Sequence, residues 1–152
     1  MGKRVSAEDQ NEAATQLVNS LTSIEGVTGE VISRTNGTQT RNIAHLQCEP
    51  ASWRKVAETM KYDHAVDHCS MITGIHWPDS SEKNWEVIYH FLRTGVTDPL
   101  ITEDGSSIIP NITEPKKLSG TEVPIEIQVN IAIPETRTPS VPSIQDIWIG
   151  AD

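Results

Sequence analysis

The chain has 152 residues and a mass of 16.8 kDa, a length that favours one domain with its own hydrophobic core. Its formal net charge is −9 at pH 7 and its lysines and arginines are scattered, which argues against nucleic acid as a partner because phosphate binding needs clustered basic residues. No apolar run approaches the roughly 18 residues that indicate a membrane span, and no apolar core follows the basic N-terminus as a signal peptide requires.

The first part of the chain predicts a helix followed by a hairpin. Ser6 and Asp9 resemble a capping box, apolar residues then recur at helical spacing, and Gly26 is expected to close the helix as a left-handed cap. Asn36-Gly37 is the strongest short signal for a hairpin, because both residues tolerate positive φ. The two strands of this hairpin are expected over residues 27–35 and 38–48.

A second helix and three further strands follow. Pro50 suits the first turn of the helix, which carries an apolar stripe. The stripe consists of Trp53, Val56, Ala57 and Met60. Alternating or β-branched residues predict strands over 66–77, 85–92 and 122–133. Residues 95–120 have no sustained period and predict a long connection before the last strand.

These elements predict a two-layer α+β sandwich, with two helices on one face of a mixed sheet of about five strands. The expected order is helix, strand, strand, helix and three strands. The predicted domain covers residues 1–133, with 95–120 as a loop insertion. Residues 134–152 form an extended C-terminal tail, because recurring proline cannot supply the N–H groups of a strand ladder.

The tail is the strongest candidate for a partner interface. Large apolar side chains lie among its prolines, and a docking arm would place Trp148 in a partner's pocket, as buried aromatic residues do at interface hot spots. The alternative is a strap that lies on the chain's own core. The predicted interface residues are Pro139, Val141, Pro142, Ser143, Ile144, Asp146, Ile147 and Trp148.

One cluster of residues could hold a metal ion, and its members are His64, His68, Cys69, His76 and His90. A spacing of four aligns two ligands on a helix, whereas the residues after His64 favour a strand. We therefore assign no catalytic, cofactor-binding or metal-binding residue to this chain. A small metal-dependent hydrolase using the His64–His90 region is an alternative hypothesis, and a free-standing protein-binding module is another. Both cysteines are expected to be free thiols in a reducing cytoplasm.

Several stretches together resemble a known family. They are the strand Val66-Asp67 to Ile75, the strand Trp85-Glu86-Val87-Ile88-Tyr89-His90-Phe91-Leu92, the alternating strand ending at Pro134, and Pro142-Ser143-Ile144-Gln145-Asp146-Ile147-Trp148. Their order and spacing are similar to those of the thirty-kilodalton-type subunit of complex I-like respiratory dehydrogenases. Ile144 replaces the usual valine of the last motif. The resemblance covers residues 50–152.

The resemblance implies a cofactor-free structural or assembly subunit of the hydrophilic arm. Its partners would be the cluster-bearing and quinone-proximal subunits, which would hold the iron–sulfur clusters and work with a flavin. Relatives serve NADH–quinone oxidoreductases and archaeal dehydrogenases of a reduced deazaflavin coenzyme, and this short acidic sequence is more similar to the archaeal type. The implied location is cytoplasmic, with peripheral membrane association through the complex. Relatives usually continue past the position of Asp152 into a Trp-x-Glu-Arg-Glu segment.

Overall fold

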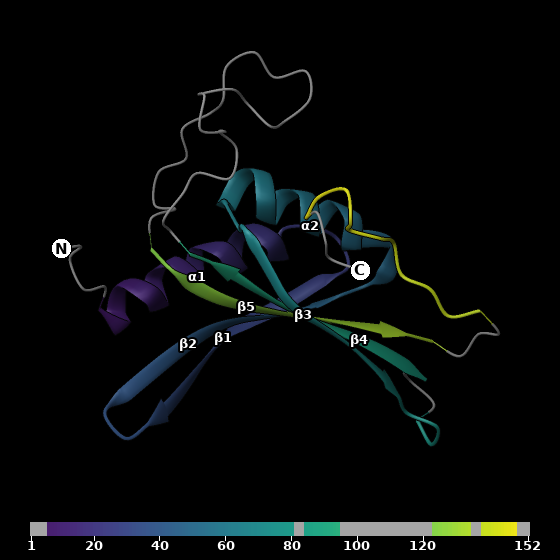
Figure 1. Cartoon of the computed structure of the whole chain (residues 1–152), viewed down its shortest axis with the longest axis horizontal. Helices are drawn as coiled ribbons and strands as arrows, with labels where there is room; N and C mark the ends of the chain where they lie inside the picture. Colours follow the sequence, from purple (N-terminus) through teal and green to yellow (C-terminus); the bar gives the residue numbers. More distant parts are fainter. Residues whose placement is uncertain (1–5, 81–83, 95–122, 135–137, 149–152) are drawn as a thin grey trace, which may run out of the picture.

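The computed structural model describes residues 6–80, 84–94, 123–134 and 138–148. The two helices and five strands follow one another in the predicted order. They are α1 (Ala7–Thr22), β1 (Val27–Asn36), β2 (Gln39–Cys48), α2 (Pro50–His64), β3 (His68–His76), β4 (Trp85–Arg93) and β5 (Ile125–Ile133). Both helices cover the same face of the sheet, so the predicted two-layer α+β sandwich is confirmed (Figure 1). The predicted connection over 95–120 lies outside the described residues.

The five strands form one mixed sheet in the order β1-β2-β5-β4-β3. β2 and β5 are parallel, and the other three neighbouring pairs are antiparallel. β5 lies in the middle of the sheet and its burial alternates residue by residue, as its sequence predicts. The buried members are Ile125, Ile127, Val129, Ile131 and Ile133. The last strand in chain order is therefore the one that joins the two halves of the sheet.

The hydrophobic core lies between the helices and the sheet, and Trp53 of α2 is its largest fully buried side chain. Its ring centroid lies 4.6 Å from that of Tyr89 and 6.0 Å from that of Phe91, both on β4. Leu17 and Leu21 of α1 are also fully buried. Burial of each such side chain stabilises the fold by about 1.5–3 kcal/mol, so the predicted apolar stripes hold the two layers together.

The predicted starts of both helices are confirmed, whereas the predicted end of α1 is not. Ser6 caps α1, because its Oγ accepts a hydrogen bond from the Asp9 N–H at 3.1 Å, and Pro50 occupies the first turn of α2. The prediction for Gly26 is wrong, because α1 ends at Thr22 and Ser23 caps it. Gly26 has a φ of 84° in the turn before β1, where a left-handed residue lets the chain reverse.

The hairpin is also offset by one residue from its prediction. Asn36 pairs with Gln39, so the two-residue loop is Gly37-Thr38 and Asn36 belongs to β1. Gly37 has a φ of 63°, whereas Asn36 has no positive φ. A glycine at the first loop position is typical of one of the two tight turns that suit the twist of a hairpin.

The face of the sheet opposite the helices is called the open face below (Figure 1). Its middle, on β5, is polar: the Gln128 amide donates to Asn130 Oδ1 at 2.9 Å, and His45 Nε2 of β2 lies 3.2 Å from the same oxygen. Ile88 and Leu92 of β4 lie beside this network and are half-buried. The open face therefore mixes polar and apolar side chains across neighbouring strands.

Candidate partner interface

The described part of the C-terminal tail, residues 138–148, runs from the end of the sheet to α2 (Figure 1). Its last residues are not extended: the N–H groups of Ile147 and Trp148 both donate to Ile144 O at 3.0 Å. This turn brings the three apolar side chains of the segment to one side. The spacing of 144, 147 and 148 is that of a single helical turn, a signal present in the sequence that the proline pattern obscured.

These three side chains are buried in the chain's own core. Ile144 is 1% exposed, Ile147 2% and Trp148 4%. The Trp148 ring lies 4.6 Å from Phe91 by centroids, and its Nε1–H donates to Val66 O at 2.9 Å. In this structure the indole packs against Phe91 of β4 and the segment that follows α2, as the strap alternative requires, and a role of Trp148 in a partner's pocket stays a prediction.

Polar side chains of α2 form hydrogen bonds to residues 143–147 of the tail. Arg54 Nη1 donates to Ser143 O at 3.0 Å and to Asp146 Oδ1 at 2.6 Å, and its other terminal nitrogen bonds the second carboxylate oxygen. The hydrogen bonds from Arg54 lower the pKa of Asp146. Lys61 Nζ donates to Ile147 O, and partial burial lowers the pKa of Lys61. Sequence reasoning missed Arg54 and Lys61, because nothing in the chain order pairs them with a segment more than 80 residues away.

Four of the other five residues of the predicted interface are exposed. Pro139, Pro142, Ser143 and Asp146 are exposed, and Val141 is half-buried against the core. The four exposed residues form an outer strip along the tail. Their role as a partner interface stays a prediction, and it now depends on this outer strip instead of on the buried tryptophan.

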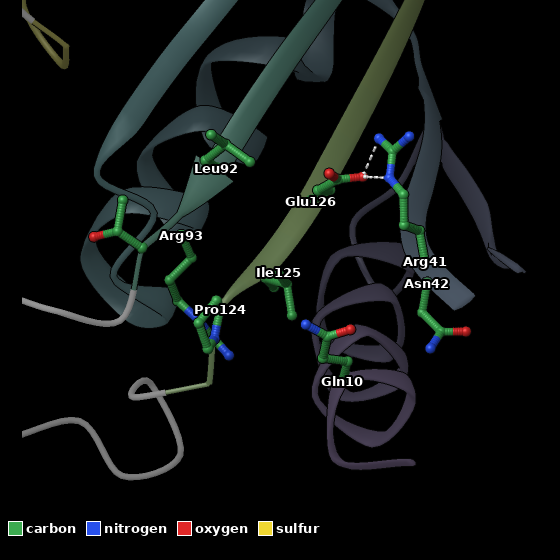
Figure 2. A pocket seen from close by; sticks show the side chains of 9 residues that line it. Gln10, Arg41, Asn42, Leu92, Arg93, Pro124, Ile125 and Glu126 are labelled. Carbon is green, nitrogen blue, oxygen red and sulfur yellow. Dashed lines mark hydrogen bonds and ion pairs between the residues drawn. The ribbon is translucent and has the colours of Figure 1, made fainter. Parts of the chain in front are cut away.

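A cavity of about 250 Å³ opens at the end of the sheet where β2 and β5 begin and β4 ends (Figure 2). Arg41 and Glu126 form an ion pair at its wall, with Nη2 and Oε2 2.7 Å apart. Arg93 is buried, and its guanidinium donates to Val123 O at 2.9 Å and to His64 O at 3.1 Å. Since both arginines bond within the chain, the cavity is a junction of elements and not a prepared anion site.

The described structure does not bring together the candidate ligands of the alternative metal-site hypothesis. Among residues 6–80, 84–94, 123–134 and 138–148, no three side chains of His, Cys, Asp or Glu could share an ion. His64 Nε2 lies 2.8 Å from Ser20 Oγ on α1, while His76 stacks on Trp85 with a centroid distance of 4.0 Å. His68 is exposed at the start of β3. His64 and His76 therefore belong to separate local contacts.

Neither thiol is an activated nucleophile. Cys48 and Cys69 are both free. Burial is the main cause that raises the pKa of Cys48, to about 12, and Glu49 adds to the effect. Burial also raises the pKa of Cys69. A protonated thiol is a poor nucleophile and a poor metal ligand, so both residues serve packing.

Within the described ranges, neither helix is long and apolar enough to cross a membrane. A search among curated proteins gives no match to this chain. One similar solved structure is a trypsin-resistant fragment (1–134) of Nqo5, with 13% identity and a TM-score of 0.48. The likeness covers 91% of this chain and 83% of that one.

The family is identified by sequence. Residues 46–152 match the model of a family described as the 30 Kd subunit of respiratory-chain NADH dehydrogenase. The match covers more than half of the chain and includes every stretch on which the resemblance was based. The matched residues also include β5 and the described part of the tail, residues 138–148. The chain belongs to the family of the 30 kDa subunit of respiratory-chain NADH dehydrogenase.

Proposed function

We propose that this chain is a structural subunit of the hydrophilic arm of a complex I-like respiratory dehydrogenase. The observation that carries the proposal is the family match over residues 46–152. A subunit of this kind holds its neighbours in place and carries no redox group itself. The iron–sulfur clusters and the flavin then belong to partner subunits, and this chain contacts the cluster-bearing and quinone-proximal ones.

The chemistry of the described residues supports a cofactor-free role. The candidate ligands are separated, because His64 contacts Ser20 and His76 stacks on Trp85. The Cys48 thiol is buried and protonated, with a pKa of about 12. A cluster site needs several thiolates or imidazoles around one point. The geometry of these side chains instead supports packing and placement.

The electron donor in this proposal is NADH or a reduced deazaflavin coenzyme, and the acceptor is a membrane quinone or phenazine. The short, acidic sequence favours the archaeal deazaflavin type. The chain itself would then be cytoplasmic and would meet the membrane through the complex.

Isolation of the native complex through a tag on this chain tests the proposal. We expect other dehydrogenase subunits to co-purify, together with flavin and iron–sulfur absorption that the chain alone does not show. The absorption spectrum and the identity of the co-purifying subunits are the two measurements. A chain recovered solely as a free monomer, or one that binds stoichiometric zinc or iron by itself, would contradict the proposal.

The outer strip of the tail is the proposed contact of this subunit with its partners. Pro142→Arg adds a bulky charge to an exposed position without removing a core side chain. We expect this variant to melt at the same temperature as the wild type and to co-purify less of the partner subunits. Thr38→Arg, in the exposed loop of the hairpin, is the matched control. Equal recovery with both variants would remove the strip from the interface.

A further inference from the structure

Exposed apolar surface is concentrated on one edge of the sheet. Among the described residues, three large apolar side chains are exposed: Met71 by 53%, Ile72 by 37% and Trp77 by 41%. The first two belong to β3 and the third follows it directly. β3 is the last strand of the sheet and pairs with β4 alone in the described structure. Single exposed apolar residues are ordinary, whereas a group on one strand indicates contact with another molecule.

The apolar residues of β3 lie on both faces of the sheet. Met71 pairs with His90, whose side chain belongs to the open face. Ile72 pairs with Tyr89, which is buried on the helix side. A partner that covered one face would leave the other residue exposed. A partner that lies along the edge of β3 would cover both Met71 and Ile72.

Among the described residues, the backbone of β3 has a strand partner on the β4 side alone. The Trp77 N–H donates to Asn84 O at 2.8 Å, which continues the ladder between β3 and β4. In an antiparallel pair, residues bonded to the neighbour alternate with residues that point away from it. By this alternation, Ile72, Gly74 and His76 direct their N–H and C=O groups to the free edge. These groups form a template for one more strand.

Beyond the bulge between Cys69 and Met71, β3 lacks the side chains that usually prevent such pairing. Natural edge strands are protected by charged side chains, proline or short length. β3 has nine residues and contains no Lys, Arg, Asp, Glu or Pro. The opposite edge strand, β1, carries the exposed charges of Glu30 and Arg34. The two edges of the same sheet therefore differ in the way expected if one of them is an interface.

A largely apolar groove of about 430 Å³ lies beside this edge, between the strands and the tail. A Cβ atom added to Gly74 would meet nothing within 4 Å, so the floor of the groove has room for a side chain of another strand. The lining includes Gly74, Ile75, Trp85, Val87, Pro139 and Val141. The groove offers a place for the apolar side chains that an added strand would point toward the helix side.

We propose that the free edge of β3 binds an extended segment of another subunit of the complex, which adds a sixth strand to the sheet. This inference rests on the proposed function, which supplies the partner. The segment would carry apolar or β-branched residues at alternate positions, to cover Ile72 and fill the groove above Gly74. Basic residues at its ends would complement Asp67 and Asp79, which flank β3, and the net charge of −9.

Charge argues against a second copy of this chain as the occupant. An antiparallel pair of two β3 strands places the Asp67 end of each beside the Asp79 end of the other. Like charges would then approach at both ends, between two chains that each carry −9. A strand from a different subunit has no such penalty.

One position provides a matched test. Gly74→Pro removes an N–H that points to the free edge and leaves the bonds to β4, since proline is tolerated on edge strands with this orientation. Gly74→Ala adds a carbon at the same place but keeps the N–H. We expect Gly74→Pro to weaken assembly with the purified partner subunits at least about five-fold relative to Gly74→Ala, the effect of losing one hydrogen bond. Equal affinity of the two variants would overturn the proposal.

Two further measurements complete the test. Ile72→Lys changes the edge without altering its backbone, and we expect it to lower recovery of the complex while its melting temperature stays that of the wild type. Hydrogen exchange of the peptide over residues 71–77 should slow on assembly of the wild-type chain. Fast exchange in the assembled complex would overturn the strand addition and leave the proposed function standing. A wild-type chain that recruits no subunit would refute the proposed function itself, and a wild-type dimer lost in Gly74→Pro would identify a second copy as the occupant.

Discussion

The sequence suggests that Trp148 contacts a partner, whereas in the structure it lies in the chain's own core. Its indole is 4% exposed, contacts Phe91 and donates to Val66 O. We expect Trp148→Ala to lower the free energy of unfolding by about 3–5 kcal/mol, because it leaves a cavity between α2 and β4. Denaturant unfolding measures this value. Trp148→Phe should cost less, since it keeps most of the packing and loses the hydrogen bond.

A different result for Trp148→Ala would favour the hypothesis that the tail is a docking arm. If the variant loses less than about 1 kcal/mol of stability but loses its partners, the side chain is not part of this core in solution. The same variant therefore separates the two hypotheses that the sequence left open.

His64 predicts a dependence of stability on pH. Burial lowers its pKa, nearby Arg93 lowers it further and Asp63 opposes them. The unfolded chain therefore takes up this proton at a higher pH than the folded chain does. The contribution of neutral His64 to stability is fully present above its unfolded pKa of about 6.5. It is lost as the pH falls from there toward the pKa of His64 in the folded chain. The melting temperature should decrease between pH 7 and pH 5.

The matched variants are His64→Gln and His68→Gln. Glutamine at position 64 can still reach Ser20 but has no proton to gain, so the melting temperature should depend less on pH. His68 is exposed, and its replacement should leave the wild-type slope. Identical slopes for all three proteins would show that His64 is not the group responsible.

At the scale of elements, the two edge strands respond differently to a methyl group. A Cβ atom at Gly29 in β1 would lie 2.6 Å from Leu46 Cδ2 and 2.9 Å from the backbone oxygen of His45. We expect Gly29→Ala to destabilise the fold by about 1–3 kcal/mol, because the neighbouring backbone must move. Gly74→Ala in β3 meets open space and should be neutral, or stabilising by up to about 1 kcal/mol. Thermal and denaturant unfolding of the two variants compare them, and equal losses would contradict the difference in space.

The elements also show which local signals are reliable. The cap at Ser6 and the proline at the start of α2 were predictable, because both depend on hydrogen bonds and dihedrals within one turn of chain. The end of α1 was not, since Gly26 acts in the turn toward β1. Its missing Cβ leaves room for Ser52 and Glu49, which come from distant sequence and lie less than 3 Å from where that atom would be.

At the scale of the whole molecule, β4 and β5 are neighbours despite the long connection between them. Arg93 pairs with Ile125, so the two ends of the connection already lie side by side. We expect replacement of residues 95–122 by a short Gly/Ser linker to preserve the fold. Each halving of the length should stabilise it by about 0.6 kcal/mol through loop closure. Circular dichroism and denaturant unfolding would measure this, and loss of the folded state would contradict it.

Local patterns in the chain were enough to establish the elements, their order and the two-layer architecture. Period-two alternation in β5 and apolar stripes in α1 and α2 are consequences of burying one face, so they can be recognised without a structure. Three strands and the last motif of the tail together carried the resemblance to the family, and the family model confirmed it.

The roles of the tail and of the sheet edges depend on the packing of the folded chain. Whether Trp148 meets a partner or its own core depends on Val66, Phe91 and the anchors Arg54 and Lys61, all far from it in sequence. Which strand is left at an edge depends on β5 inserting between β2 and β4. Both are long-range pairings, and long-range pairing is set by packing of the whole chain instead of by any local pattern.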